Sequence, residues 1–105
     1  MRTLKFKIES QRIKKDPDCD FSGLIAGSKG YLECEFEFSR EWDGLAKAAV
    51  FKTADYVKYM PLKGNQCSIP DEVAVSTRIH VSVVGKDKSM MLTTNSAVIM
   101  QKKGV

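Results

Sequence analysis

The feature that most constrains the fold of this chain is an alternation of apolar and polar side chains. It is clearest between Tyr31 and Phe38, where apolar residues alternate with three glutamates. Successive side chains of a β-strand point to opposite faces of a sheet, so this pattern predicts a half-buried strand. Thr3 to Glu9 alternates in the same way, with lysines on its polar side. If the two strands are neighbours, these lysines offset the repulsion between the glutamates.

Further short β-rich stretches follow at intervals of about 8 to 12 residues, and no segment sustains a helical period. Turn residues separate them at 63–65 and 85–88, while Pro61 and Pro70 are expected at an edge or a strand end. We therefore predict an all-β fold, a single β-sandwich of about seven to eight short antiparallel strands, with a small barrel as the alternative. The remaining strands are expected at 11–15, 47–52, 56–62, 66–69, 78–84, 90–93 and 97–101, and 71–75 forms one helical turn at most.

The whole chain, residues 1–105, is expected to be one domain, because 105 residues are too few for two self-sufficient cores. Hydrophobic residues make up 43% and charged residues 29%, which suits a folded globular domain. No apolar run approaches the roughly 18 to 20 residues that cross a bilayer, so no membrane partner is expected. The N-terminal residues also lack the continuous apolar block of a secretory signal.

The three cysteines, Cys19, Cys34 and Cys67, are an odd number and form no metal-binding spacing. Cys34 and Cys67 fall on apolar strand faces, which favours small buried hydrophobic residues over metal ligands. Free thiols indicate folding in a reducing compartment.

The N-terminal fifteen residues hold six of the basic residues and only one acidic residue, Glu9, although the net charge of the chain is only +4. Lys5, Lys7 and Lys14 are the candidate contacts within this segment. Either they form a solvated outer strand face, or they bind an anionic partner such as a capsid surface or nucleic acid. No aromatic side chains interleave with these cations as base stacking requires, which favours the first reading.

A glycine-containing loop follows from Cys19 to Gly30, and the aspartates before it form a D-x-D-x-D pattern. Asp18 and Asp20 are candidate contacts for a partner. Alternating carboxylates suit calcium, but a calcium-binding EF-hand loop continues with glycine and glutamate where this chain has Phe21 and Gly27. We therefore predict no metal site here.

Trp42, the only tryptophan, precedes an Asp-Gly turn. An indole beside a turn commonly caps one end of a sandwich core while its N–H finds a backbone acceptor. Contact with a partner is the alternative. His80, the only histidine, lies in a predicted strand with no aspartate partner suggested, and no nucleophile, phosphate-binding or zinc motif occurs. The chain is therefore predicted not to be an enzyme and to need no cofactor.

Several stretches together resemble a known group of proteins. They are residues 18–32, residues 36–51 with the pattern Phe-Ser-x-Glu-Trp-Asp-Gly at 38–44, and residues 67–70, 83–85 and 92–95. This combination resembles short virion proteins and N-terminal modules of tailed bacteriophages and prophages. The resemblance implies an immunoglobulin-like sandwich located in the virion, near baseplate, tail or capsid proteins. The family supplies no catalytic residues.

The expected function is therefore a non-enzymatic phage structural or accessory protein that binds other virion proteins, as head decoration or as a tail or baseplate component. Such a protein is made in the host cytoplasm and assembles as a homo-oligomer or in many copies, where weak individual contacts suffice. The alternative is a small phage-encoded intracellular inhibitor or regulator that binds a host protein or nucleic acid.

Overall fold

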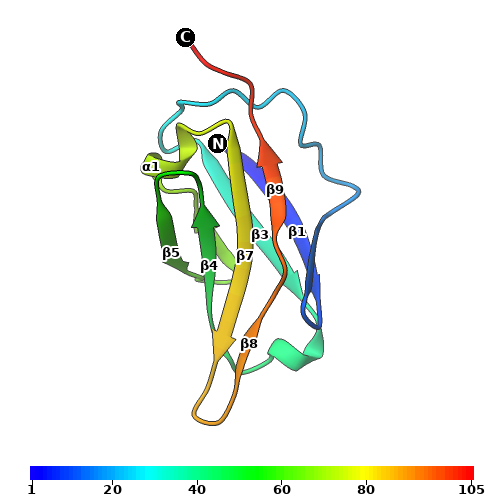
Figure 1. The fold of residues 1–105 in the computed structure, drawn as a ribbon. Coiled ribbons are helices and arrows are strands. Elements are labelled where there is room, and N and C mark those ends of the chain that lie inside the picture. Colours follow the sequence, from blue (N-terminus) through cyan, green and yellow to red (C-terminus); the bar gives the residue numbers. More distant parts are fainter.

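The computed structural model describes residues 1–105 as two β-sheets packed face to face (Figure 1). Besides the strands there is one 3-10 turn, η1 (Arg40–Trp42), and one single-turn helix, α1 (Asp71–Ala74). No helix is long and apolar enough to span a bilayer. The nine strands are β1 (Arg2–Glu9), β2 (Arg12–Lys15), β3 (Leu32–Phe38), β4 (Ala46–Lys52), β5 (Val57–Pro61), β6 (Gln66–Ser68), β7 (Arg78–Lys86), β8 (Met91–Thr93) and β9 (Ala97–Met100).

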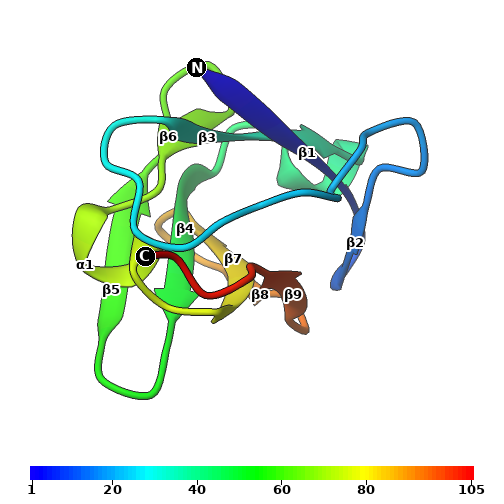
Figure 2. The ribbon, with the colours of Figure 1, turned by 90° about the horizontal axis from the view of Figure 1, so that it is seen from above.

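The all-β sandwich predicted from the alternation is confirmed. One sheet has the order β2-β1-β3-β6, and the other has the order β5-β4-β7-β8, with β9 also paired to β7. Seen from above, β1, β3 and β6 form one layer and β4, β5, β7 and β9 form the other (Figure 2). The buried apolar side chains of the two sheets meet in the layer between them, as in aligned sandwiches.

The pairing of β1 with β3 is parallel, whereas the sequence analysis expected antiparallel strands throughout. The chain leaves β1 through the β2 hairpin and then crosses one end of the sandwich in the long loop before β3 begins, so β3 starts at the same end as β1. The parallel register sets Lys5 opposite Glu35 and Lys7 opposite Glu37. The prediction that the lysine strand and the glutamate strand are neighbours is therefore confirmed. Their parallel direction is not indicated by the alternation of side chains.

The core between the sheets is continuous and is organised around stacked aromatic rings. Phe6 of β1 stacks on Phe36 of β3 with ring centroids 5.5 Å apart, and Phe21 of the long loop meets Phe6 edge-on at 5.3 Å. From the facing sheet, Phe51 and Ile79 are fully buried against them. The long loop thus contributes Phe21 and Leu24 to the packing of the core.

Hydrogen bonds outside the named strands hold the β2 edge and the end of the sandwich that the long loop crosses. On the β2 edge, the Asn95 side chain accepts the N–H of Ile13 at 2.8 Å, and the Asn95 N–H donates to the carbonyl of Gln11. At the end crossed by the long loop, the Ala26 N–H donates to Lys102 and the Gly27 N–H donates to Ala74. These contacts tie the loop to the C-terminal segment and to α1.

Trp42 caps the core beside η1, which confirms its structural role. Its ring has no exposed surface and lies 5.3 Å from the ring of Phe38. Its indole N–H donates to the carbonyl of Ser10 at 2.8 Å, so the one polar atom of the ring is satisfied.

Gly85 lies in β7, whereas the sequence analysis placed it in a turn. A Cβ atom on Gly85 would lie 2.8 Å from the Trp42 ring, so only glycine lets the indole approach the strand this closely. The strand therefore continues to Lys86, and the turn begins at Asp87, whose carboxylate accepts the N–H groups of Ser89 and Met90. By contrast the expected turn at Gly64 and Asn65 is present, with positive φ at both residues.

We expect Trp42→Ala to lower the free energy of unfolding by about 3 to 5 kcal/mol, because it empties a fully buried site. Urea unfolding monitored by circular dichroism measures the change. A loss below about 1 kcal/mol would contradict the buried position of the ring.

Gly85→Ala tests the same contact from the other side. The added methyl group overlaps the indole, and we expect a loss of about 1 to 3 kcal/mol. The control is Ala48→Gly on the adjacent strand β4, which measures how much an exchange between alanine and glycine within a strand changes stability by itself. Recovery of stability when Gly85→Ala is combined with Trp42→Phe would show that the overlap is with the indole.

Candidate functional site

The outer face of the β2-β1-β3-β6 sheet carries the candidate lysines and no apolar side chain. The inward positions of these strands, such as Leu4, Phe6 and Ile8, are buried, so the alternate positions face solvent. These outward residues are Thr3, Lys5, Lys7, Glu9, Arg12, Lys14, Glu33, Glu35, Glu37, Gln66 and Ser68.

Two of the candidate lysines lie in a cross-strand ladder of ion pairs. Lys5 Nζ is 3.7 Å from Glu35 Oε2, and Lys7 Nζ is 3.8 Å from Glu37 Oε2. Glu35 also accepts a hydrogen bond from the Gln66 side chain at 3.0 Å. All these side chains are at least partly exposed, so each ion pair is weak and salt-sensitive. The ladder nevertheless pairs two of the three lysines that the sequence analysis considered as contacts for a partner.

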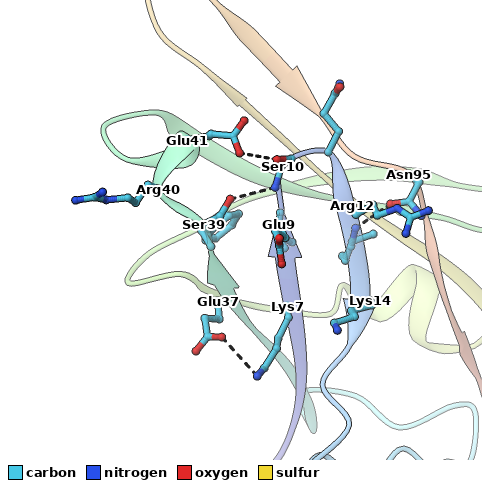
Figure 3. Close-up of a pocket in the computed structure, with 14 residues that line it drawn as sticks. Lys7, Glu9, Ser10, Arg12, Lys14, Glu37, Ser39, Arg40, Glu41 and Asn95 are labelled. Carbon is cyan, nitrogen blue, oxygen red and sulfur yellow. Dashed lines mark hydrogen bonds and ion pairs between the residues drawn. The ribbon is translucent and has the colours of Figure 1, made fainter.

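The cations of β2 are different, because no carboxylate lies within ion-pair distance of Arg12 or Lys14. Lys14 faces Lys7 across the hairpin, so two positive charges adjoin there. Figure 3 shows Lys7 and Lys14 on neighbouring strands, with the Lys7 ammonium turned toward Glu37. Lys15 points the other way and lies 5.1 Å over the ring of Phe21. Arg12 and Lys14 are thus the outward cations of the hairpin that are free to meet a partner.

An open groove runs beside the turn of the β1–β2 hairpin, between the hairpin and η1 (Figure 3). Its floor is fixed by Ser10, whose hydroxyl donates to Glu41 at 2.6 Å and whose N–H donates to the Ser39 hydroxyl at 3.1 Å. Arg40 projects away from the hairpin at its far side (Figure 3). The charged side chains that line it are Lys7, Glu9, Arg12, Lys14, Glu37, Arg40 and Glu41.

The aspartates of the loop are occupied by local turns. The Asp16 carboxylate accepts the N–H of Asp18 at 2.9 Å, while the Asp20 carboxylate accepts both the N–H and the hydroxyl of Ser22. These two hydrogen bonds from Ser22, and the nearby Arg2, hold the pKa of Asp20 below its ordinary value. No three acidic, histidine or cysteine side chains converge as a metal site would require. Asp18 remains exposed, with its carboxylate available to solvent.

The structure therefore brings together only part of the predicted site. Lys5, Lys7 and Lys14 share one face, and the loop that carries Asp18 and Asp20 runs beside β1, where the Lys5 N–H lies 3.3 Å from Cys19 Sγ. Trp42 lies inside the core and has no surface to offer a partner, which rules out the partner-contact alternative for this side chain in this conformation.

Sequence reasoning missed Arg12 and the η1 residues Arg40 and Glu41 as parts of the groove. Arg12 alternates with Lys14 along β2, so its outward direction was readable from the pattern. Arg40 and Glu41 come close to the hairpin only because β3 runs parallel to β1 and ends beside its turn. No local signal in the sequence indicates this.

Cys34 and Cys67 are the reduced, buried thiols that the sequence analysis expected. They are direct partners across the β3–β6 pair, and both face the core. Burial raises the pKa of Cys34 well above its ordinary value, and it raises the pKa of Cys67 from 9.0 to about 12. Both thiols are therefore neutral and poor nucleophiles at neutral pH.

No protein-family model, curated protein sequence or solved structure matches this chain.

We expect the Lys7–Glu37 coupling, measured with the double-mutant cycle Lys7→Ala and Glu37→Ala, to be below about 1 kcal/mol. Side-chain exposures of 39% and 75% leave the pair screened by water. Raising the salt concentration should reduce the coupling further. A coupling that does not respond to salt would contradict an exposed electrostatic ladder.

We also expect the free energy of unfolding to fall as the pH rises above about 9. An unfolded Cys67 loses its proton near its ordinary pKa of 9.0, whereas the folded thiol keeps its proton until about pH 12. Ionisation then favours the unfolded chain across that interval. Because the pKa of Cys34 is raised in the same direction, the measurement compares urea unfolding of the native chain with that of Cys67→Ala. Equal pH slopes for the two proteins would contradict the shift.

Proposed function

We propose that this protein is a non-enzymatic accessory component of a tailed-bacteriophage particle, and that it binds other virion proteins through the outer face of the β2-β1-β3-β6 sheet. The resemblance of the Phe-Ser-x-Glu-Trp-Asp-Gly stretch to phage virion modules supports the class of protein. In this chain that stretch forms the last residue of β3, η1 and the turn behind it, so it builds one wall of the groove beside the hairpin.

The observation that carries the proposal is the pair of free cations on the edge hairpin. Arg12 and Lys14 lie on a solvent-exposed face and form no ion pair, even though Glu9 is opposite Arg12 in the register, whereas Lys5 and Lys7 each have a paired glutamate. A protein surface with matching carboxylates would gain ion pairs at Arg12 and Lys14 without first breaking any within the chain. The row of glutamates on β3 lies across β1 from these cations, so the face has a positive strip and a negative strip that would orient a partner.

Many copies in one particle would make such weak contacts sufficient for stable attachment, because repeated contacts between neighbours add up through multivalency. Weak repeated contacts are what this surface can offer, because its charges are exposed to water and its groove is open.

Mass spectrometry of purified particles tests the proposal, with the protein expected among the virion components. Arg12→Glu combined with Lys14→Glu should lower its incorporation by about tenfold or more, because both free cations are reversed. Lys29→Glu combined with Lys103→Glu makes the same change of charge at exposed positions away from the hairpin, and should leave incorporation unchanged. A protein that is absent from particles, or equally incorporated in all three forms, would overturn the proposal.

The same cations favour a second candidate, an intracellular regulator that binds nucleic acid. Lys14 and Lys7 face each other across the hairpin, and two adjacent positive charges suit phosphates. Retention on DNA that falls steeply with salt, together with absence from virions, would select this candidate. If the Arg12→Glu and Lys14→Glu double variant were retained on DNA as strongly as the native chain, nucleic acid would not bind at this face.

A further inference from the structure

The outer face of the other sheet has the opposite character, because it is largely apolar. Strands β5, β4, β7 and β9 lie side by side in this sheet (Figure 1). The inward side chains of β4 and β7, such as Phe51, Val81 and Val83, are fully buried, so the alternate residues point outward. Outward apolar side chains come from four strands and include Val57, Tyr59, Val84, Met91, Val98 and Met100.

Four of these side chains are largely exposed, and Val84 and Val98 are partly exposed. The exposed fractions are 63% for Tyr59, 65% for Met91, 53% for Val57 and 52% for Met100. Val50 lies between Tyr59 and Ser82 in the register and is the only outward residue that its neighbours bury. A small hollow lies between Pro61 and Met91 on the same face.

An apolar outer face is unusual, because the outward positions of a sandwich that meets only water are polar, as they are on the β2-β1-β3-β6 sheet. β7 is nine residues long and four strands lie side by side, so at ~3.3 Å per residue and ~4.8 Å per strand this face covers roughly 500 Å². That is a fitting size for the apolar centre of an interface that buries about 800 Å² on each partner.

The charged side chains that point outward from the strands of this face have one sign, and the nearest acidic residues, Asp55 and Asp87, lie in the hairpin turns outside the strands. Its outward charged residues are Lys52, Arg78 and Lys86, each near the end of a strand. None of the five strands of this sheet contains an aspartate or a glutamate. The face therefore presents an apolar centre with a cationic rim, and nothing on its strands can neutralise that rim.

We infer that this outer face of β5, β4, β7 and β9 is a second interaction surface, and that its partner is an acidic protein segment with apolar side chains at its centre. The partner's carboxylates meet Lys52, Arg78 and Lys86, while its apolar side chains cover Tyr59, Val84 and Val98. This surface lies on the opposite side of the sandwich from the charged hairpin. A chain that uses both faces connects two partners.

A second copy of this chain fits the surface poorly. In a two-fold symmetric contact the same patch occurs on both sides, so the outward cations of the strands would face one another, while the Asp87 carboxylate at the margin already accepts the N–H groups of Ser89 and Met90. The net charge of +4 adds to this repulsion. Charge complementarity thus selects an acidic partner over self-association.

The test uses the isotope-labelled full chain and two synthetic peptides. One contains leucine and tyrosine flanked by glutamates, and in the other each glutamate is replaced by lysine. We expect the acidic peptide to shift the amide resonances of β4, β5, β7 and β9 in nuclear magnetic resonance spectra, and the basic peptide to leave them unchanged. No shift with the acidic peptide, equal shifts with both peptides, or shifts confined to β1 and β2 would overturn the inference.

Variants assign the two parts of the surface. Lys52→Glu combined with Lys86→Glu should weaken binding of the acidic peptide by about five- to tenfold. Tyr59→Ser should also weaken binding. It should leave the melting temperature near that of the native chain, since this ring is largely exposed. Lys29→Glu combined with Lys103→Glu is the charge-matched control and should not alter binding. If the control pair weakened binding equally, the loss of affinity would come from the net charge of the chain. That result would overturn the role assigned to Lys52 and Lys86.

Two further measurements exclude other occupants. Sedimentation of the chain alone should give the monomer mass of 11.7 kDa. A dimer that Tyr59→Ser dissociates would show that a second copy occupies the face. Binding to vesicles that contain phosphatidylserine, lost in the Lys52→Glu and Lys86→Glu variant, would show that a membrane does. Either result would overturn the acidic protein partner.

Discussion

The parallel pairing of β1 with β3 is the interaction on which the rest of the structure depends. On the inner side it stacks Phe6 on Phe36 and so places the aromatic centre of the core. On the outer side it sets lysines opposite glutamates at every second residue. The inner contact contributes most of the stability, because burial of aromatic surface outweighs exposed ion pairs. The outer contact specifies register, since a shift by one residue would move the charged side chains into the core.

The same pairing decides where the candidate site lies. Because β3 ends beside the β1–β2 turn, η1 lies against the hairpin, and the Ser10 hydroxyl reaches Glu41. The Trp42 indole is held there by the carbonyl of Ser10, and Gly85 leaves the space for its ring. One cluster of contacts thus caps the core and forms the wall of the groove. This links the motif that resembles phage modules to a structural role as well as to the proposed binding surface.

The two outer faces of the sandwich differ in the forces that they offer to a partner. The β2-β1-β3-β6 face offers charge, with its free cations at Arg12 and Lys14. The opposite face offers apolar surface around Val84, with cations at its margin. Electrostatic contacts orient a partner and speed its approach, whereas apolar burial slows its release. A protein that connects neighbours in an assembly has a use for both.

The sequence by itself determined the class of fold, the inward side chains and most strands, because alternation with a period of two is a local property that survives in any β-sandwich. It also identified Trp42 as a capping residue, the buried thiols and the turn at Gly64 and Asn65. Only the tertiary structure decided the parallel direction of β3, the place of Gly85 under an indole forty-three residues away in sequence, and which lysines are free. Those features depend on which strand lies next to which, and strand order is set by the packing of the whole chain rather than by any segment of it.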